Sequence, residues 1–245
     1  MKIKNKIHWQ ILKSFENYKN TNDKKTNEWV QHYLGSNKAT LGIKSSEMVK
    51  MAKEIARDNN FNKKSLVKLL DSLYSKATSF AEVDMAARLL GVLPKIRKEL
   101  EPEVLDYWLN FTHGWAENDV LCQNNFTAEE VLGNWSKWEK LIIKFSNDEN
   151  VNKRRASMVL LVRSLRDSED RRLSELAFEL VEKMKWEKDI LITKAISWLL
   201  RALVKFHKDE VLEYLEAKQE SLPKIAYREA LAKVETGRKN RLLSE

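Results

Sequence analysis

Helix-breaking residues are scarce in this sequence. Only three prolines and six glycines occur in 245 residues. Because proline removes a helical hydrogen bond and glycine weakens a helix, their scarcity lets long stretches stay helical. Apolar residues recur with a period near 3.6, and no stretch alternates in the way a half-buried strand does. The sequence therefore predicts an all-α protein.

The periodicity predicts a series of helices joined by short connections. Helix starts are indicated by Ser45, by Pro102 and by Thr127 with Glu130, a pair whose spacing is typical of a capping box. Five glycines, at 35, 42, 114, 133 and 237, lie where helices are expected to stop or start. The expected helices cover residues 5–19, 26–34, 45–58, 63–76, 79–92, 102–111, 114–123, 127–145, 151–166, 169–184, 188–206, 208–217 and 222–235.

Paired helices with short turns must stack on their neighbours, because each helix has one apolar stripe that it cannot bury alone. We expect an α-solenoid of HEAT-like helical repeats, forming a single domain over residues 1–245 with a concave basic cleft. A compact helical bundle is the alternative, since the sequence shows no internal period clean enough to prove a repeat.

The charge balance favours an anionic partner. Forty-four Lys and Arg against thirty-six Asp and Glu give a formal charge of +8. A nucleic-acid backbone, an anionic membrane or an acidic protein would each suit this charge. No apolar stretch is long enough to span a membrane, and the basic N-terminus lacks the apolar region of a signal peptide. We expect a soluble, cytoplasmic protein that does not bind membranes.

Metal and nucleotide cofactors are not expected. The single cysteine, Cys122, excludes an intrachain disulfide and a cysteine-based zinc site, and is expected to be a small core residue. His8, His32, His113 and His207 lack the spacing of metal ligands and are expected at the surface or at helix caps. No glycine-rich phosphate loop occurs.

Two residues in GWAENDVLC combine an aromatic ring with a carboxylate. Trp115 and Asp119 are separated by four positions, so their side chains lie on one side of a helix and can touch the same ligand. The alternative is a core tryptophan with a solvated or capping aspartate.

Basic residues accompany this pair in two later helices. Arg154 and Arg155 precede the apolar stripe of residues 159–162, although arginines at such positions are usually simply exposed. One helical face carries Lys194, Trp198 and Arg201, and this face is suited to contact with DNA. The alternative is that these long side chains only cover the edge of the core, with their charged ends in water.

Five stretches of the sequence resemble one known family. They are YLGSNKATLGI (33–43), GWAEND (114–119), NKRRASMVLL (152–161), KAISWLLR (194–201) and YREALAKVETGRKN (227–240). In their order and spacing they resemble the AlkD-like DNA alkylation repair proteins, which are alkylpurine DNA glycosylases made of HEAT-like repeats. The resemblance covers residues from about 33 to 240, and KAISWLLR and the closing helix are its most distinctive parts.

The resemblance implies roles for individual residues. It implies that Asp119 is the catalytic carboxylate, that Trp115 and Trp198 form aromatic walls around the sugar of the lesion, that Arg155 lines the cleft and that Tyr33 adds an aromatic ring there. The sequence departs from the family at Ala116, where a second acidic residue usually follows the tryptophan. The remaining residues expected to bind DNA are Arg154, Lys194, Arg201, Arg238 and Lys239.

The expected activity is that of a monofunctional DNA glycosylase that excises purines alkylated at N3 or N7. Its expected partner is double-stranded DNA with alkylated bases, bound by a monomer. Two alternatives come from other classes. One is a non-catalytic protein that binds DNA structure on the same scaffold, and the other is a protein-interaction scaffold whose aromatic residues anchor a partner helix.

Overall fold

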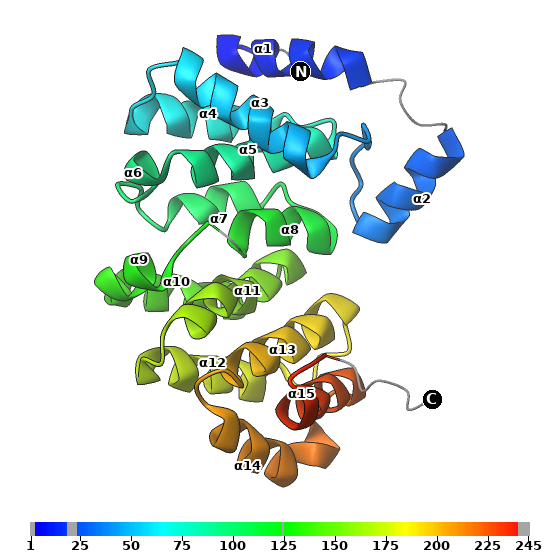
Figure 1. Cartoon of the computed structure of the whole chain (residues 1–245), viewed down its shortest axis with the longest axis vertical. Helices are drawn as coiled ribbons and strands as arrows, with labels where there is room; N and C mark the ends of the chain where they lie inside the picture. Colours follow the sequence, from blue (N-terminus) through cyan, green and yellow to red (C-terminus); the bar gives the residue numbers. More distant parts are fainter. Residues whose placement is uncertain (1–2, 19–23, 124, 240–245) are drawn as a thin grey trace. The chain divides into compact units, whose positions relative to one another are not determined.

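The computed structural model describes residues 3–18, 24–123 and 125–239 of the chain. Helices make up most of the described residues, which contain no strand beyond one isolated bridge between Ala39 and Ser79. The chain divides into two compact units, residues 1–125 and residues 126–245. The expected all-α helical repeat fold is confirmed (Figure 1). The single domain and the concave basic cleft stay predictions.

Unit 1 contains eight α-helices and a short 3-10 turn, Glu16–Tyr18, within its described residues. The α-helices are α1 (Lys6–Phe15), α2 (Lys24–Leu34), α3 (Ser45–Asp58), α4 (Lys63–Ser75), α5 (Phe80–Val92), α6 (Pro94–Arg97), α7 (Val104–Leu109) and α8 (Gly114–Cys122). Helix α5 lies at the centre, because it packs against α3, α4 and α8. Its residues are accordingly buried on nearly every side.

Unit 2 contains seven α-helices and a 3-10 turn, Gln219–Ser221, within its described residues. The α-helices are α9 (Ala128–Gly133), α10 (Trp135–Ser146), α11 (Val151–Asp167), α12 (Arg171–Met184), α13 (Ile190–Leu203), α14 (Lys208–Lys218) and α15 (Lys224–Thr236). Helix α13 packs between α11 and α15 and buries Ile192, Ile196, Leu199 and Leu200. These three helices bring together basic side chains that are far apart in the sequence.

Several helix boundaries differ from those expected. The helix expected over 127–145 is two helices, because the chain leaves the helical conformation at Asn134, directly after Gly133. Pro102 lies in a turn before α7 and not in its first turn, and the helical turn 94–97 was not expected. The capping box of Thr127 and Glu130 is confirmed. Ser45 is the first residue of α3 and provides no side-chain cap.

One histidine prediction is wrong. His8 is completely buried, where Nδ1 lies 2.8 Å from Ser72 Oγ and Nε2 lies 2.9 Å from Glu82 Oε1. Its polar partners are 64 and 74 positions away, so no local pattern indicated them. These contacts fasten α1 to α4 and α5. Cys122 is buried in the core, as expected.

None of the helices in the described residues combines the length and the apolar character needed to cross a bilayer.

Candidate functional site

Helix α8 carries Trp115 and Asp119, and a close backbone contact sets where it begins. Gly114 has φ 70°, and a Cβ atom added there would lie 2.1 Å from the carbonyl oxygen of Gly35. Gly35 itself has φ 65° and follows the last residue of α2. Only glycine permits both the left-handed conformation and this approach. The two glycines therefore bring the end of α2 against the start of α8.

A buried ion pair reinforces the same junction. Lys38 Nζ lies 2.6 Å from Glu117 Oε2 and donates another hydrogen bond of 2.8 Å to the Phe111 carbonyl. Glu117 is fully buried and also accepts from the His113 backbone N–H at 3.0 Å and from the Ser36 hydroxyl. Each carboxylate oxygen thus has a donor, which is what makes a buried charge tolerable.

The position of Glu117 bears on the departure from the family pattern at Ala116. The Ala116 side chain is buried and has no polar atom with which to form a hydrogen bond. Glu117, one position later, anchors the loop after α2 to the start of α8. An acidic residue is therefore present in this turn, with a structural partner.

Three aromatic rings lie next to one another at this junction. The Trp115 indole N–H donates a 2.8 Å hydrogen bond to the Tyr33 carbonyl, and the two rings meet edge to face with centroids 5.5 Å apart. Trp29, one turn earlier in α2, stacks on Tyr33 with centroids 5.6 Å apart and planes 6° apart. Trp29 is 65% exposed and Tyr33 58% exposed. Unit 1 therefore has an exposed aromatic cluster, Trp29, Tyr33 and Trp115.

Asp119 lies one helical turn after Trp115 and is only 7% exposed. A carboxylate in such surroundings has little water to screen it, so its interaction with a nearby positive charge is stronger than at an open surface. Its position on α8 is supported by the glycine contact and the buried ion pair at the start of that helix. In unit 1, Tyr33 and Trp115 are thus in direct contact, and Asp119 lies on the same helix as Trp115.

The two arginines at the start of α11 have different environments. Arg154 is held by Glu187, with Nη2 2.9 Å from Oε2, and by the carbonyls of Asp148 and Glu149. Arg155 is 3% exposed, and its Nη1 donates a 2.6 Å hydrogen bond to the Leu191 carbonyl at the start of α13. Both side chains contribute to the structure of unit 2. Contact between Arg155 and a phosphate stays a prediction.

Helix α13 presents the second tryptophan and its basic neighbours. Lys194 is exposed, whereas Trp198 and Arg201 are half-buried. Arg201 Nε donates to Ser197 Oγ at 3.3 Å and lies 3.6 Å from Glu229 Oε2 on α15. The Arg166 guanidinium, at the end of α11, lies over the Trp198 ring with Cζ 5.9 Å from its centroid. Trp198 is thus a tryptophan already in contact with a cation.

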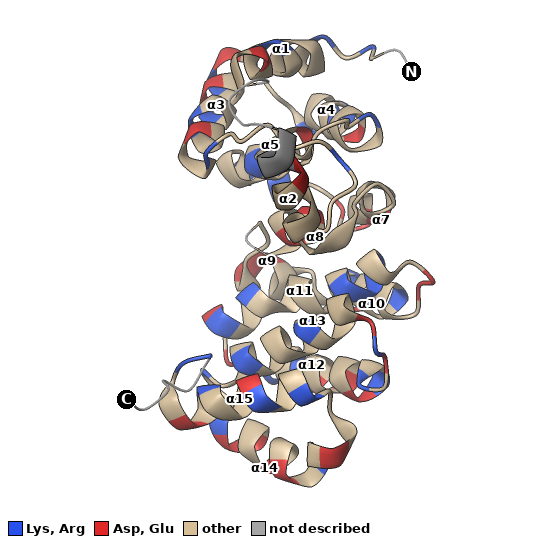
Figure 2. Ribbon diagram, turned by 90° about the vertical axis from the view of Figure 1, so that its right-hand side faces the viewer, with Lys and Arg blue, Asp and Glu red and all other residues tan. Residues whose placement is uncertain are grey.

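The basic residues after α15 lie beside this group. Lys239 Nζ is 3.3 Å from Glu229 Oε1, so one carboxylate serves both Lys239 and Arg201. Arg238 is exposed. Figure 2 shows the Lys and Arg residues along α11, α13 and α15. Within unit 2 the structure brings Arg201 and Lys239 together, with Trp198 on the same helix as Arg201. Asn240, the end of the last family motif, lies outside the described residues.

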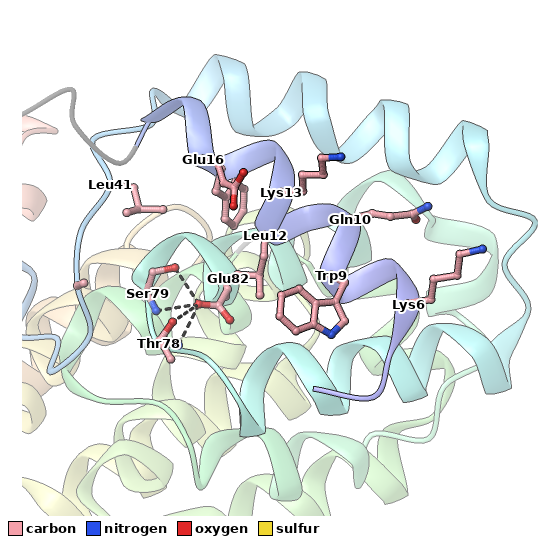
Figure 3. Close-up of a pocket in the computed structure, with 12 residues that line it drawn as sticks. Lys6, Trp9, Gln10, Leu12, Lys13, Glu16, Leu41, Thr78, Ser79 and Glu82 are labelled. Atoms are coloured by element: carbon pink, nitrogen blue, oxygen red, sulfur yellow. Dashed lines mark hydrogen bonds between the residues drawn. The ribbon is translucent and has the colours of Figure 1, made fainter. Parts of the chain in front are cut away.

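Unit 1 also contains a pocket away from the residues predicted to be functional. Its volume is about 860 Å³, and it is lined by α1, by Ala39 and Leu41, and by the start of α5 (Figure 3). Glu82 Oε2 accepts hydrogen bonds from Thr78 and Ser79 at its wall. Because the same carboxyl group contacts His8, these bonds serve to fix α1.

Sequence reasoning missed Trp29 and Arg166, which lie next to predicted residues. Trp29 and Tyr33 are four positions apart, and this spacing was a signal that would have placed both on one face of a helix. Arg166 is eleven positions after Arg155, which is close to three helical turns. No group of three or more His, Cys, Asp or Glu side chains within residues 3–18, 24–123 and 125–239 is arranged to hold a metal ion.

Comparisons with known proteins agree with this arrangement of helices. Among solved structures, the predicted DNA alkylation repair enzyme from Enterococcus faecalis aligns with a TM-score of 0.63 over 87% of this chain and 96% of that chain. The two sequences are 19% identical, so this likeness establishes the fold alone. No curated protein matches the sequence. The model of the DNA alkylation repair enzyme family matches residues 11–234, which is most of the chain. The chain therefore belongs to the family of DNA alkylation repair enzymes.

Proposed function

We propose that this protein is a monofunctional DNA glycosylase that removes purines alkylated at N3 or N7 and leaves an abasic site. Membership of a DNA alkylation repair family supports a role on damaged DNA. The observation that carries the finer proposal is the nearly buried Asp119 one turn from Trp115, on a helix that contacts the exposed ring of Tyr33.

The chemistry requires one well-placed carboxylate. Alkylation at N3 or N7 gives the base a positive charge. When the bond from the base nitrogen to C1′ of the deoxyribose breaks, its electron pair neutralises the base, which leaves without a strong general acid. The sugar becomes oxocarbenium-like, and a carboxylate facing it stabilises that charge. A water molecule then forms the new bond to C1′ and loses its proton, for which Asp119 is the acceptor in this proposal.

Tryptophan rings provide selectivity for the charged lesion. A cation over an indole face gains about 0.5 to 2 kcal/mol, depending on how far it is desolvated. Trp115, in contact with Tyr33 and through it with Trp29, offers such a surface in unit 1. A neutral base gains less from the same surface, so normal purines are discriminated against by weaker stabilisation.

Basic residues of unit 2 supply affinity for the duplex in this proposal. Lys194 and Arg238 are exposed, and Arg201 is half-buried. Contacts from such side chains to phosphates do not depend on base sequence and weaken with salt. The formal charge of +8 supports binding of double-stranded DNA by a monomer through such residues.

The deciding experiment measures release of free methylated purine from methylated duplex DNA by the purified protein. Wild-type protein should release 7-methylguanine or 3-methyladenine, and Asp119→Asn should lower the rate by about 10²- to 10³-fold, the loss typical of removing one group that stabilises the transition state. Asp58→Asn is the matched control, because its carboxylate is 60% exposed and pairs with Arg57 on α3. Equal rates for the wild type and Asp119→Asn would exclude this mechanism.

The same assay, together with a measurement of binding to duplex DNA, separates the alternatives. A protein that binds methylated duplex but releases no base is the non-catalytic DNA-binding protein. A protein that binds no duplex at low salt is the protein-interaction scaffold, because electrostatic binding to DNA is strongest there.

A further inference from the structure

Unit 2 contains a pocket of about 750 Å³ whose walls are mainly basic. It is formed by the end of α11, the second half of α13, the first residue of α14 and the end of α15. Two carboxylates, Asp167 and Glu235, also line it. Its six cations, which define what we call the basic pocket, are Arg166, Arg201, Lys205, Lys208, Lys233 and Lys239.

The nearby carboxylates only partly neutralise these cations. Asp167 forms an ion pair with Arg163, in which Arg163 Nε lies 3.3 Å from Asp167 Oδ2. Glu229, on α15, lies within 3.6 Å of Arg201 and within 3.3 Å of Lys239, so one carboxylate is shared by two cations. Among the residues that the structure describes, no carboxylate oxygen lies within 4.0 Å of the charged groups of Arg166 or Lys208. The basic pocket therefore carries a net positive charge that these carboxylates do not neutralise.

Burial makes this arrangement electrostatically costly. It lowers the pKa of both the Arg166 and Arg201 guanidinium groups, and the charge of Arg166 lowers the pKa of Arg201 further, against the opposing effect of Glu229. Both groups keep their charge, since arginine does not lose its proton in proteins. An anion between the two guanidinium groups would relieve this cost, and guanidinium groups bind two oxygens of a phosphate at once.

We propose that the basic pocket binds a phosphate group of the DNA backbone. This inference rests on the proposed function only in taking DNA as the source of the phosphate. It adds Arg166, Lys205, Lys208 and Lys233 to the DNA-binding residues. Arg166 both lines the pocket and lies over the Trp198 ring. A phosphate bound there fixes the position of the Arg166 guanidinium, which is also the cation that lies over the Trp198 ring.

The test measures affinity for unmodified duplex DNA at several salt concentrations, with the full chain. The variant Arg166→Gln with Lys208→Gln removes two pocket cations. Its matched control, Arg171→Gln with Lys188→Gln, removes one arginine and one lysine from exposed positions of unit 2 outside the pocket. We expect about a tenfold loss of affinity for the pocket variant only, and a slope of log K against log salt that is about one unit shallower.

Two further measurements keep the test decisive. Arg166→Lys, which retains the charge but not the paired donors, should keep the salt slope and bind DNA less tightly than the wild type. Calorimetry with inorganic phosphate identifies the source. If the pocket variant loses phosphate binding but keeps wild-type DNA affinity, the ligand is free phosphate and the DNA proposal is wrong.

An equal loss of DNA affinity in both double variants would also overturn the proposal, since it would reflect total charge and not the pocket. None of these measurements uses base release. If no base is released but the pocket variant binds DNA weakly, the glycosylase proposal fails and the phosphate site stands.

Discussion

The α8 region of unit 1 and the basic pocket of unit 2 manage their charged groups in opposite ways. At the start of α8, the buried carboxylate of Glu117 has a lysine partner and further donors. In the basic pocket, six cations share a few carboxylates, and one guanidinium lies over an indole ring. Paired buried charges fix a structure, whereas unmatched cations attract an anion. In the two proposals, accordingly, unit 1 holds the reactive groups in place and unit 2 binds the phosphate backbone.

The strongest test of this comparison replaces one buried ammonium group in each unit. Lys38→Met leaves the fully buried Glu117 without its cation, which should lower the free energy of unfolding by about 3 to 5 kcal/mol. Lys185→Met is the matched control, because Lys185 is equally buried but its partner Glu182 is 40% exposed. That change should cost less than about 1 kcal/mol. Chemical denaturation measures both values, and similar losses would contradict the assigned role of Glu117.

Glycine replacement tests the backbone contact that places α8. Gly114 and Gly237 both have φ 70°, so alanine is strained at either position. Only at Gly114 would the new Cβ meet backbone, 2.1 Å from the Gly35 carbonyl, while nothing lies within 4 Å at Gly237. Gly114→Ala should therefore destabilise by about 1 to 3 kcal/mol more than Gly237→Ala. It should also lower base release, because the Gly35–Gly114 contact must open.

The buried carboxyl group of Glu82 in unit 1 makes stability depend on acid. Burial raises the pKa of this carboxyl group, but hydrogen bonds from His8, Thr78 and Ser79 outweigh that effect and hold its pKa below the ordinary 4.5. A carboxyl group with a lowered pKa in the folded state contributes stability above its unfolded pKa and loses it as the pH falls through the folded pKa. Stability should therefore decline as the pH falls below about 4.5.

Glu82→Gln isolates this contribution. At neutral pH it should lower the free energy of unfolding by about 1 to 3 kcal/mol, since the charged acceptor is lost. The decline below pH 4.5 should then be flatter than in the wild type. Glu103→Gln, at an exposed position, serves as control and should follow the wild-type pH profile. Denaturation curves between pH 3 and 7 would refute the assignment if Glu82→Gln kept the full acid dependence.

The smallest expected effect concerns the exposed aromatic cluster. Trp29 is 65% exposed and stacks on Tyr33, whereas Trp186 in unit 2 is 68% exposed and lies near Lys185. Trp29→Ala should weaken binding to DNA with a cationic lesion by about 0.5 to 2 kcal/mol and leave binding to unmodified DNA nearly unchanged. Trp186→Ala should change neither. An equal loss for both kinds of DNA would show that Trp29 does not recognise the lesion's charge.

Local patterns in the sequence predicted much of the structure. The helical class and the Thr127 capping box are confirmed. So is the burial of Cys122. The helical class and the capping box depend on residues within a few positions of one another, which is the range over which helical periodicity and capping act. The shared helix of Trp115 and Asp119 belongs to the same class of prediction. The burial of Cys122 follows from the residue type, since free cysteines are usually buried. The break at Asn134 was missed, because glycine near a helix end does not reveal whether the chain resumes the helix.

The partners of individual side chains depended on contacts far along the chain. Lys38 and Glu117 are 79 positions apart, and His8 and Glu82 are 74 apart. A histidine expected at the surface thus proved to be buried. Arg155 donates to a carbonyl 36 positions away, and Arg166 meets Trp198 on another helix.

The sequence alone determined that this chain forms helices and which family it belongs to. Only the tertiary structure decided that Gly35 meets Gly114, that Trp29 extends the aromatic cluster, and that six cations surround one pocket. The physical reason is the range of the interactions. Helical hydrogen bonds join residues four apart, whereas buried charges find their partners through the packing of whole helices.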